Sequence, residues 1–386
     1  MVSAACATLN RMSKGRVIVA MSGGVDSSVA ALLLHQQGYE VIGVTMRLWT
    51  VENEDVPAHS KRCCSVEDTE DARRVCQSIG VPHYVQNFER EFQEHVVDYF
   101  VREYDRGRTP HPCLACNDKI KFDFLLRRAM FLDADYIATG HYARIRNGGQ
   151  SYRLLKGADA NKDQSYVLFT LTQTELGRLL FPVGEYPKSQ IRQIAADAGL
   201  PVADKPDSQD ICFIPDGDYK KFVGERNQPR PGDYVDLDGN SLGQHPGVQF
   251  FTIGQRRGLG LSGGTGDPRF VVKINPVSNQ VTLGSHDDLY QTHLWASRTN
   301  FPSDVPLGKP LSVTAKIRYK ASESPATITV HDGTAEIRFD EPQRAITPGQ
   351  AIVFYQDDEL VGGGIIEVEP PSKAAATPAI EASATV

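Results

Sequence analysis

Two groups of residues in this chain have the types and spacing to carry chemistry. Cys113 and Cys116 form a Cys-x-x-Cys pair, and Cys212 lies far beyond them in the sequence. Thiolates are nucleophiles, and one thiol can pass sulfur to another. The Gly-rich run Ser22–Ser28 (Ser-Gly-Gly-Val-Asp-Ser-Ser) has the composition of a phosphate-binding loop. A chain that offers both groups predicts sulfur transfer driven by a nucleotide.

The Gly-rich run stands where a strand is expected to turn into a helix. The apolar residues Val17–Ala20 are typical of a strand buried on both faces. A helix is predicted after the run, over about 29–37, with Ser27 or Ser28 as its cap. The first amides of that helix attract an anion, and two glycines leave room for it. The run is therefore predicted to bind phosphate, and the alternative is a turn without a ligand.

An acid stands in this loop where the Walker-type loop has a lysine. That loop requires a lysine before its Ser or Thr, whereas here Asp26 occupies the region. A carboxylate beside phosphates is a ligand for a divalent cation. Asp26 is therefore predicted to bind Mg²⁺ through the phosphates of a nucleotide.

The local sequence predicts that Cys116 is reactive. Two prolines argue against a regular helix before Cys113, and Asn117 is predicted to cap a helix over 118–131. Cys116 then falls at a helix amino terminus beside basic residues, a setting that lowers the pKa of a thiol. Cys212 is flanked by apolar residues and by itself would more often be a core residue. A chemical role for Cys212 is favoured because sulfur transfer needs a second thiol beside that of Cys116.

Length and composition narrow the class of protein. The chain has 386 residues, a net charge of −7 and seven cysteines. No apolar run is long enough to span a bilayer, so no contact with a membrane is expected. The negative charge argues against indiscriminate nucleic-acid binding but permits a local basic surface. The number of cysteines is odd and the first residues make a poor signal peptide, so the cysteines are expected to be thiols. Thiols predict a reducing compartment, here the cytoplasm.

The residue composition and the spacing of apolar residues change along the chain, and these changes predict its domains. Alternating strands and helices in the first part favour an α/β domain with a doubly wound parallel sheet. Later residues are rich in Gly and Pro, with short alternating runs typical of antiparallel barrels. The predicted parts are a flexible amino terminus (1–15), a catalytic domain (16–215), a small linker domain (216–285), a C-terminal β-barrel (286–369) and a disordered tail (370–386).

Three further features allow two interpretations each. The run 316–320 is predicted to be a basic strand, suited to a phosphate backbone or an unstacked base, and Arg318 and Tyr319 lie in it. The alternative is a solvated edge strand guarded by lysine. Met46, at the end of the second strand, could pack on an adenine ring or in the core. His141 could be a structural residue or a substrate contact.

Seven motifs follow one another along the chain, beginning at Ser22 (SGGVDSS), Cys63 (CCSVED), Gly107 (GRTPHPCLACN), Thr139 (TGHY), Lys162 (KDQ), Ser208 (SQDIC) and Phe251 (FTIGQ). Taken in this order, from about residue 16 to 368, the chain resembles the bacterial tRNA-specific 2-thiouridylase family. This family belongs to the PP-loop ATP pyrophosphatases, which have the adenine nucleotide alpha hydrolase-like fold. The resemblance implies a tRNA-uridine 2-sulfurtransferase that splits ATP into AMP and pyrophosphate and thiolates the wobble uridine of tRNAs for Lys, Glu and Gln.

The resemblance also implies roles for individual residues. Cys116 would be the catalytic thiol and Cys212 the persulfide carrier, and the two would form a disulfide after turnover. ATP would be held by Ala20, Met21, Ser22, Gly23, Gly24, Val25, Asp26, Ser27, Met46 and Gly140. The tRNA would contact His111, Pro112, Cys113, His141, Lys162, Asp163, Gln164, Arg318, Tyr319 and Gln350, with the segment 111–113 approaching the target base.

Other chemistries stay open from the sequence alone. Some members of the family have Asp at the position of Cys113, so Cys113, Cys116 and Cys212 could together hold a [4Fe-4S] cluster. A PP-loop amidotransferase or ligase would need no thiol pair. A zinc-organised RNA-binding module could use Cys113 and Cys116 with two of Cys63, Cys64, Cys76 or His59. A thiolase also needs a sulfur donor, which is expected to be a cysteine desulfurase or a relay protein.

Overall fold

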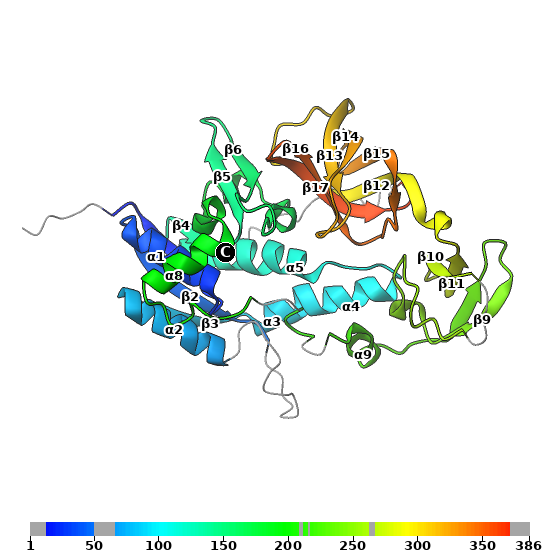
Figure 1. Ribbon diagram of the computed structural model, residues 1–386, viewed down its shortest axis with the longest axis horizontal. Coiled ribbons are helices and arrows are strands. Elements are labelled where there is room, and N and C mark those ends of the chain that lie inside the picture. The colour runs from blue at the N-terminus through cyan, green and yellow to red at the C-terminus, as the bar shows by residue number, and fades with distance from the viewer. Residues whose placement is uncertain (1–12, 50–65, 208–210, 215–216, 262–266, 371–386) are drawn as a thin grey trace, which may run out of the picture.

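A computed structural model describes residues 13–49, 66–207, 211–214, 217–261 and 267–370. Figure 1 shows the first sheet with its helices at one end of the molecule, the strands of residues 232–284 at the other end, and the strands of residues 290–367 at the top between them. Helix α4 (Asp98–Asp105) runs below the strands of residues 290–367, from the first part toward the hairpin of β10 (Phe270–Asn275) and β11 (Gln280–Gly284). The Cys63–Cys64 pair, His59 and most of both predicted tails (1–12 and 371–386) lie outside the described residues.

The first part of the chain builds a five-stranded parallel sheet in the order β3-β2-β1-β4-β7. Successive side chains of a strand point to opposite faces, and both faces of this sheet are buried. Val17 and Val19 pack on one side, whereas Ile18 and Ala20 belong to the core on the other. The strands are β1 (Arg16–Ala20), β2 (Glu40–Arg47), β3 (His83–Asn87), β4 (Tyr136–Ala138) and β7 (Leu179–Leu180).

Helices cover both faces, which confirms the predicted doubly wound sheet. One face carries α1 (Val25–Gln36), α2 (Val66–Ile79) and α8 (Lys188–Asp197), whose buried residues share a core with Val17. The other face carries a run of short helical segments that share the core of Ile18. These segments are α3 (Glu89–Phe92), η1 (Gln93–Val97), α4 (Asp98–Asp105), α5 (Pro112–Ala115), η2 (Cys116–Phe124) and α6 (Leu125–Phe131).

The middle part forms a small four-stranded sheet in the order β10-β11-β8-β9. Tyr234, Phe251 and Val271 are buried in its core. Its strands are β8 (Gly232–Val235), β9 (Ser241–His245), β10 (Phe270–Asn275) and β11 (Gln280–Gly284), preceded by α9 (Tyr219–Gly224). Short helical turns elsewhere are η3 (Ser165–Leu168), α7 (Gln173–Leu176), η4 (Pro182–Glu185), η5 (Val248–Phe250) and η6 (Asp287–Leu289).

The last strands close into a β-barrel, as predicted. They follow the order β12-β15-β14-β13-β16-β17, and β17 pairs back with β12. The strands are β12 (Tyr290–Asn300), β13 (Pro310–Lys316), β14 (Ser324–His331), β15 (Thr334–Arg344), β16 (Ala351–Gln356) and β17 (Glu359–Glu367). The hairpin of β5 (Ala143–Asn147) and β6 (Tyr152–Lys156) from the first part pairs with β17 and ties the barrel to the catalytic domain.

Several predicted element boundaries are wrong. Helix α1 begins at Val25, four residues before the predicted start. The strand expected over 316–320 ends at Lys316, so Arg318 and Tyr319 lie in the turn after β13. The domain boundaries at 215 and 285 stay predictions. None of the described helices is both long enough and apolar enough to cross a bilayer.

Candidate active site

The Gly-rich loop joins β1 to α1 and leaves helix amides available to an anion. Gly24 is the N-cap residue of α1, and no side chain accepts a hydrogen bond from the first turn. The predicted capping by Ser27 or Ser28 is therefore wrong. Both hydroxyls instead donate to the carbonyl oxygen of Gly24, at 3.2 and 2.8 Å. The amides that a cap would have used face the loop, where a phosphate would be bound.

Backbone contacts explain why the loop needs its glycines. Gly23 has a φ of 72° and packs directly against the backbone of Asp68 in α2. Gly140 follows β4, and a Cβ atom there would lie 2.7 Å from the Ser27 amide nitrogen. Gly140 thus supports the start of α1 from the neighbouring strand. The other residues predicted to hold ATP include Ala20, Met21, Val25, Ser27 and Met46, which are buried, and Ser22, which is exposed.

Replacing Gly140 with alanine is expected to disturb the loop. The added methyl group must push the first turn of α1 away, at a cost of about 1–3 kcal/mol in the free energy of unfolding. ATP affinity is expected to fall by about tenfold, because the amides that face the phosphates move together with that turn. Isothermal titration with ATP would measure the change. Gly224→Ala is the control, because the backbone there has no positive φ and a Cβ would meet its nearest neighbour, the Phe250 ring, at an ordinary contact distance of 3.4 Å.

A buried lysine faces the acid of the loop. Lys188, the first residue of α8, lies 2.7 Å from Asp26 Oδ1 and 2.9 Å from Asp207 Oδ1. The Tyr142 hydroxyl donates to the same Asp26 oxygen at 2.7 Å. Only 11% of the Lys188 side chain is exposed, so its charge acts in an environment of low dielectric constant. Sequence reasoning missed Lys188, although Asp26 itself was a signal that a cation should be nearby.

Asp207 gathers three cations beside the loop. Its carboxylate binds Lys162 at 2.8 Å, Arg192 at 2.8 Å and Lys188. Burial alone would raise the pKa of Asp207, but the hydrogen bonds from Lys162 and Lys188 lower this pKa to about 2. The Asp207 carboxylate is thus charged at neutral pH. It offsets part of the positive charge of Lys162, Lys188 and Arg192, which together leave an excess of positive charge beside the loop. Such an excess next to a helix amino terminus suits a triphosphate.

The helix that carries the Cys-x-x-Cys pair begins earlier than predicted. Pro112 is the first residue of α5, a position that proline favours. His111 is the N-cap, and its Nδ1 accepts a hydrogen bond from the Leu114 amide at 3.3 Å. Cys113 therefore lies in the first turn and is exposed, whereas Cys116 starts the π-helical segment η2 and is half-buried. Asn117 is no cap, because it is buried and donates to the Val167 carbonyl oxygen.

Cys116 and Cys212 pack against the same hydrophobic core. The ring of Phe213, next to Cys212, lies 5.8 Å from the ring of Phe92 and 5.3 Å from that of Phe100. These rings belong to α3 and α4, the same helical face against which η2 packs. The two thiols are therefore on one side of the fold, although ninety-six positions separate them in the sequence.

The four cysteines that the structure describes, Cys76, Cys113, Cys116 and Cys212, do not fit a metal cluster in this arrangement. Within the described ranges, no three His, Cys, Asp or Glu side chains are close enough together to hold a metal ion. Cys113 is exposed while Cys116 and Cys212 are half-buried. Cys76, in α2, is buried in the core on the opposite face of the sheet, where it packs on Gly43 of β2, so it cannot join Cys113 in a zinc site. The cluster and zinc interpretations thus find no donor set among these residues.

Cys76 and Cys113 are expected to react with an alkylating reagent at very different rates. Burial raises the pKa of the Cys76 thiol to about 11, so roughly one thiol in a thousand is ionised at pH 8. Cys113 is exposed and lies in the first turn of a helix. Mass spectrometry after brief iodoacetamide treatment at pH 8 should find Cys113 labelled and Cys76 intact. Labelling of Cys76 at an equal rate would contradict its burial.

The barrel holds the segment that precedes the thiols. Gln350 donates to the carbonyl oxygen of Thr109 at 2.8 Å, and the Thr109 amide donates to the Pro348 carbonyl oxygen. Arg108 binds Glu103 at 2.7 Å and Glu367 of β17 through both terminal nitrogens. Gln350, predicted to contact tRNA, thus positions the chain that leads to Cys113.

Other residues predicted to contact tRNA also have partners within the protein. Gln164 accepts from the Tyr142 amide at 3.0 Å, and Asp163 accepts from the amides of Gly157 and Ser165. His141 is buried between two phenylalanine rings and bonded to Thr139, and this burial lowers its pKa well below the ordinary value. These positions favour structural roles, and direct contacts of these three side chains with tRNA stay predictions.

Aromatic rings and an arginine, all buried or half-buried, lie around the amino-terminal end of α5. The ring centroid of His111 lies 6.0 Å from that of Tyr166 and 6.5 Å from that of Tyr319. Burial lowers the pKa of His111, so its imidazole is neutral at pH 7. Arg318, next to Tyr319, is half-buried and close enough to Tyr166 to influence its ionisation. This group could receive a base that has left its stack.

Comparison with known proteins identifies the family. The chain matches the family model described as tRNA methyl transferase HUP domain over residues 15–216. The models for the PRC-barrel domain of the same family and for an aminomethyltransferase beta-barrel domain match residues 220–285 and 291–366.

Relatives are similar over nearly their whole length. The tRNA-specific 2-thiouridylase MnmA 2 of Caldanaerobacter subterraneus subsp. tengcongensis is 52% identical over 358 residues, which are 91% of this chain and 98% of the relative. The tRNA-specific 2-thiouridylase MnmA of Carboxydothermus hydrogenoformans is 50% identical over 361 residues, 92% of this chain and 98% of the relative. With half of its residues shared with these enzymes, the chain belongs to the tRNA-specific 2-thiouridylase family.

Proposed function

We propose that this protein is an ATP-dependent tRNA-uridine 2-sulfurtransferase that replaces the C2 oxygen of the wobble uridine with sulfur in tRNAs for Lys, Glu and Gln. The observation that carries the proposal is the arrangement of one phosphate loop and two thiols. The loop opens at one end of β1, and Cys116 and Cys212 pack against the core on one face of the same sheet. Curated relatives at about half identity carry the same activity in their names.

ATP supplies the leaving group for the oxygen. A carbonyl oxygen is a poor leaving group, so the C2 oxygen first attacks the α-phosphorus of ATP and pyrophosphate leaves. The amides of α1 and the ammonium of Lys188 are placed to hold the phosphates and to stabilise the charge that develops on pyrophosphate. Asp26 fits a Mg²⁺ ion bound with the nucleotide, which would neutralise further phosphate charge.

The thiols supply sulfur to the activated uridine. Cys212 carries a persulfide whose terminal sulfur attacks C2, and AMP leaves with the original oxygen. The thiolate of Cys116 then attacks the Cys212 sulfur, which releases 2-thiouridine and leaves a Cys116–Cys212 disulfide. A thiol reductant must reduce this disulfide before the next turnover. Release of hydrosulfide by Cys116 before the attack on C2 gives the same products.

The RNA enters past the aromatic residues. The half-buried residues His111, Tyr319 and Arg318 lie around the amino-terminal end of α5, where a flipped uridine and its phosphate would be bound. Cys113 is the exposed residue nearest to this entry on α5. A cysteine desulfurase or a relay protein would load Cys212 with sulfur.

Product analysis tests this function. Purified protein, unmodified tRNA, Mg²⁺-ATP and a persulfide donor should give 2-thiouridine at the wobble position together with equal amounts of AMP and pyrophosphate. Nucleoside mass spectrometry measures the 2-thiouridine, and chromatography measures the AMP and pyrophosphate. A PP-loop ligase is the second candidate: it would form AMP without tRNA and would remain active after Cys113, Cys116 and Cys212 were all replaced.

A further inference from the structure

Four arginines at the junction of the middle sheet and the barrel have no acidic partner within 4.0 Å among the described residues. They are Arg256, Arg257, Arg318 and Arg344, and together they are called the arginine surface here. Other half-buried arginines in the molecule do have carboxylate partners. Arg108 binds Glu103 and Glu367, and Arg192 binds Asp207. Arg178 is a half-buried exception, so what distinguishes this surface is that two half-buried arginines without a carboxylate partner, Arg318 and Arg344, lie next to each other.

Two of these arginines are held directly together. A terminal nitrogen of Arg318 donates to the Arg344 carbonyl oxygen at 2.5 Å. Arg344 ends β15, and its guanidinium lies 5.7 Å from the ring centre of Phe270 in the middle sheet. Burial and then the neighbouring charge of Arg344 lower the pKa of Arg318. Like charges placed together destabilise a protein unless an anion binds between them.

The remaining arginines continue the surface across the middle sheet. Arg256 and Arg257 are exposed in the turn that follows Gly254. A Cβ at Gly254 would lie 2.9 Å from that of Ala345, so this turn lies directly against the residue after Arg344. The Gly254 amide donates to Val271, and the Val271 amide donates to Gln255, so the turn is fixed on β10.

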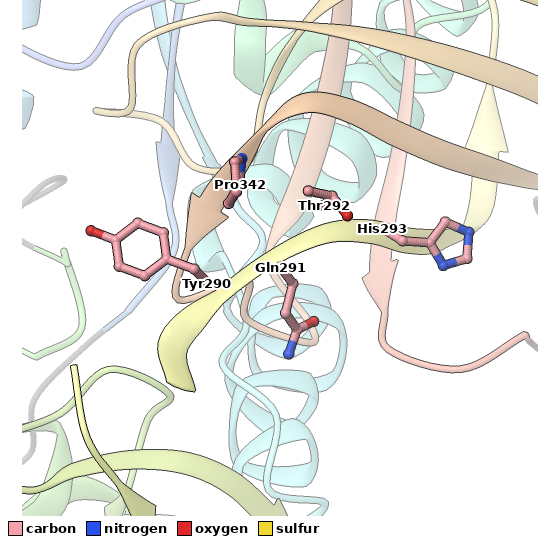
Figure 2. Close-up of a pocket in the computed structure, with 5 residues that line it drawn as sticks. All are labelled: Tyr290, Gln291, Thr292, His293 and Pro342. Atoms are coloured by element: carbon pink, nitrogen blue, oxygen red, sulfur yellow. The ribbon is translucent and has the colours of Figure 1, made fainter. Parts of the chain in front are cut away.

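Exposed acids bound the surface on one side. Tyr290 lies opposite Arg344 in the β12–β15 ladder, and beyond it the two strands separate into a shallow groove. Figure 2 shows the ring of Tyr290 pointing away from His293, which lies at the other end of this groove. Asp340 and Glu341 are exposed near the groove, so an anion is favoured only on the Arg344 side of Tyr290.

We infer that the arginine surface binds the phosphate backbone of the tRNA, and that Arg344 is a tRNA-binding residue beside Arg318. This inference rests on the proposed function and extends its RNA contacts from the thiol helix to the middle sheet. Guanidinium groups bind phosphates through paired hydrogen bonds, and such contacts position RNA without reading its sequence. Tyr290 and Phe270 provide rings beside these charges.

Arg344→Gln tests the inference, with Arg338→Gln as the matched control. Arg338 lies on the same strand, but it is exposed and paired with Glu336 at 2.6 Å. We expect Arg344→Gln to weaken tRNA binding roughly five- to tenfold and to lower the salt dependence, the slope of log K against log salt, by about 1. The loss should be equal for cognate and non-cognate tRNA, because phosphate contacts carry no sequence information.

Equal affinities and slopes for the two variants, with normal binding by the wild type, would overturn this inference and leave the proposed function intact. Absence of tRNA binding by the wild type would overturn both. Should Arg344→Gln fail to fold, the wild type can be probed with phenylglyoxal and mass spectrometry. Protection of Arg344 by tRNA, with Arg338 unprotected, would support the inference, and equal modification of Arg344 with and without tRNA would refute it.

Discussion

Cys116→Ser is expected to abolish 2-thiouridine formation while tRNA binding and ATP binding stay within twofold of the wild type. A serine hydroxyl is not ionised near neutral pH and cannot open a persulfide by attack on sulfur. Cys116 is half-buried against the core, and serine keeps its approximate size, so the fold should persist. Thiouridine would be measured by nucleoside mass spectrometry and tRNA affinity by filter binding.

Two further variants make this result specific. Cys212→Ser should also lose thiolation, but it should in addition fail to accept labelled sulfur from a persulfide donor. Cys76→Ser should thiolate normally if it folds, because Cys76 lies in the core on the opposite face of the sheet. Normal thiolation by Cys116→Ser would remove this residue from the mechanism.

Lys188→Met is expected to lower tRNA-dependent pyrophosphate release by at least about a hundredfold, the range measured for loss of one group that stabilises transition-state charge. The ammonium lies 2.7 Å from Asp26 in the phosphate loop, so phosphates bound there would lie next to it. Methionine resembles the unbranched alkyl part of the lysine side chain but lacks the ammonium group, with its charge and hydrogen-bond donors. Pyrophosphate release from labelled ATP gives the rate.

Loss of an ion pair could also unfold the loop, so stability needs its own measurement. Lys188 binds both Asp26 and Asp207, and its removal leaves two carboxylates with fewer partners. Lys309→Met, at an exposed position of the barrel, is the control. If Lys188→Met melts like the control and still releases pyrophosphate at the wild-type rate, Lys188 has no role in the reaction.

Much of the fold is visible in the sequence because its signals are local. The apolar run Val17–Ala20 followed by two glycines identified β1 and the loop, and the change in texture after Pro229 indicated the barrel. Both depend on hydrophobic periodicity and on turn residues, which act over a few positions. The family motifs then supplied roles that periodicity alone cannot give.

The starts of both functional helices were misplaced for a physical reason. Ser27, Ser28 and Asn117 are residue types that favour N-caps, but here they lie inside helices and bond elsewhere. Gly24 and His111 serve as the N-caps instead. A side-chain preference of about 1 kcal/mol is easily outweighed by packing of the helix that follows.

The cation network could not be read from the sequence. Lys188 approaches Asp26 only because α8 packs beside α1, and Asp207 meets Lys162 and Arg192 through similar long-range packing. Nothing in the spacing of these residues indicates their contact. The contact of Arg344 with Arg318 could not be read from the sequence either, because it depends on how the barrel strands are paired.

The most direct test of the account follows the oxygen that sulfur replaces. A tRNA that carries oxygen-18 at C2 of its wobble uridine would be thiolated by the purified protein with unlabelled ATP in a single turnover. Mass spectrometry of the products should find the heavy oxygen in the phosphate of AMP, with unlabelled pyrophosphate. Heavy oxygen in inorganic phosphate beside ADP, or unlabelled AMP beside thiolated tRNA, would contradict the account.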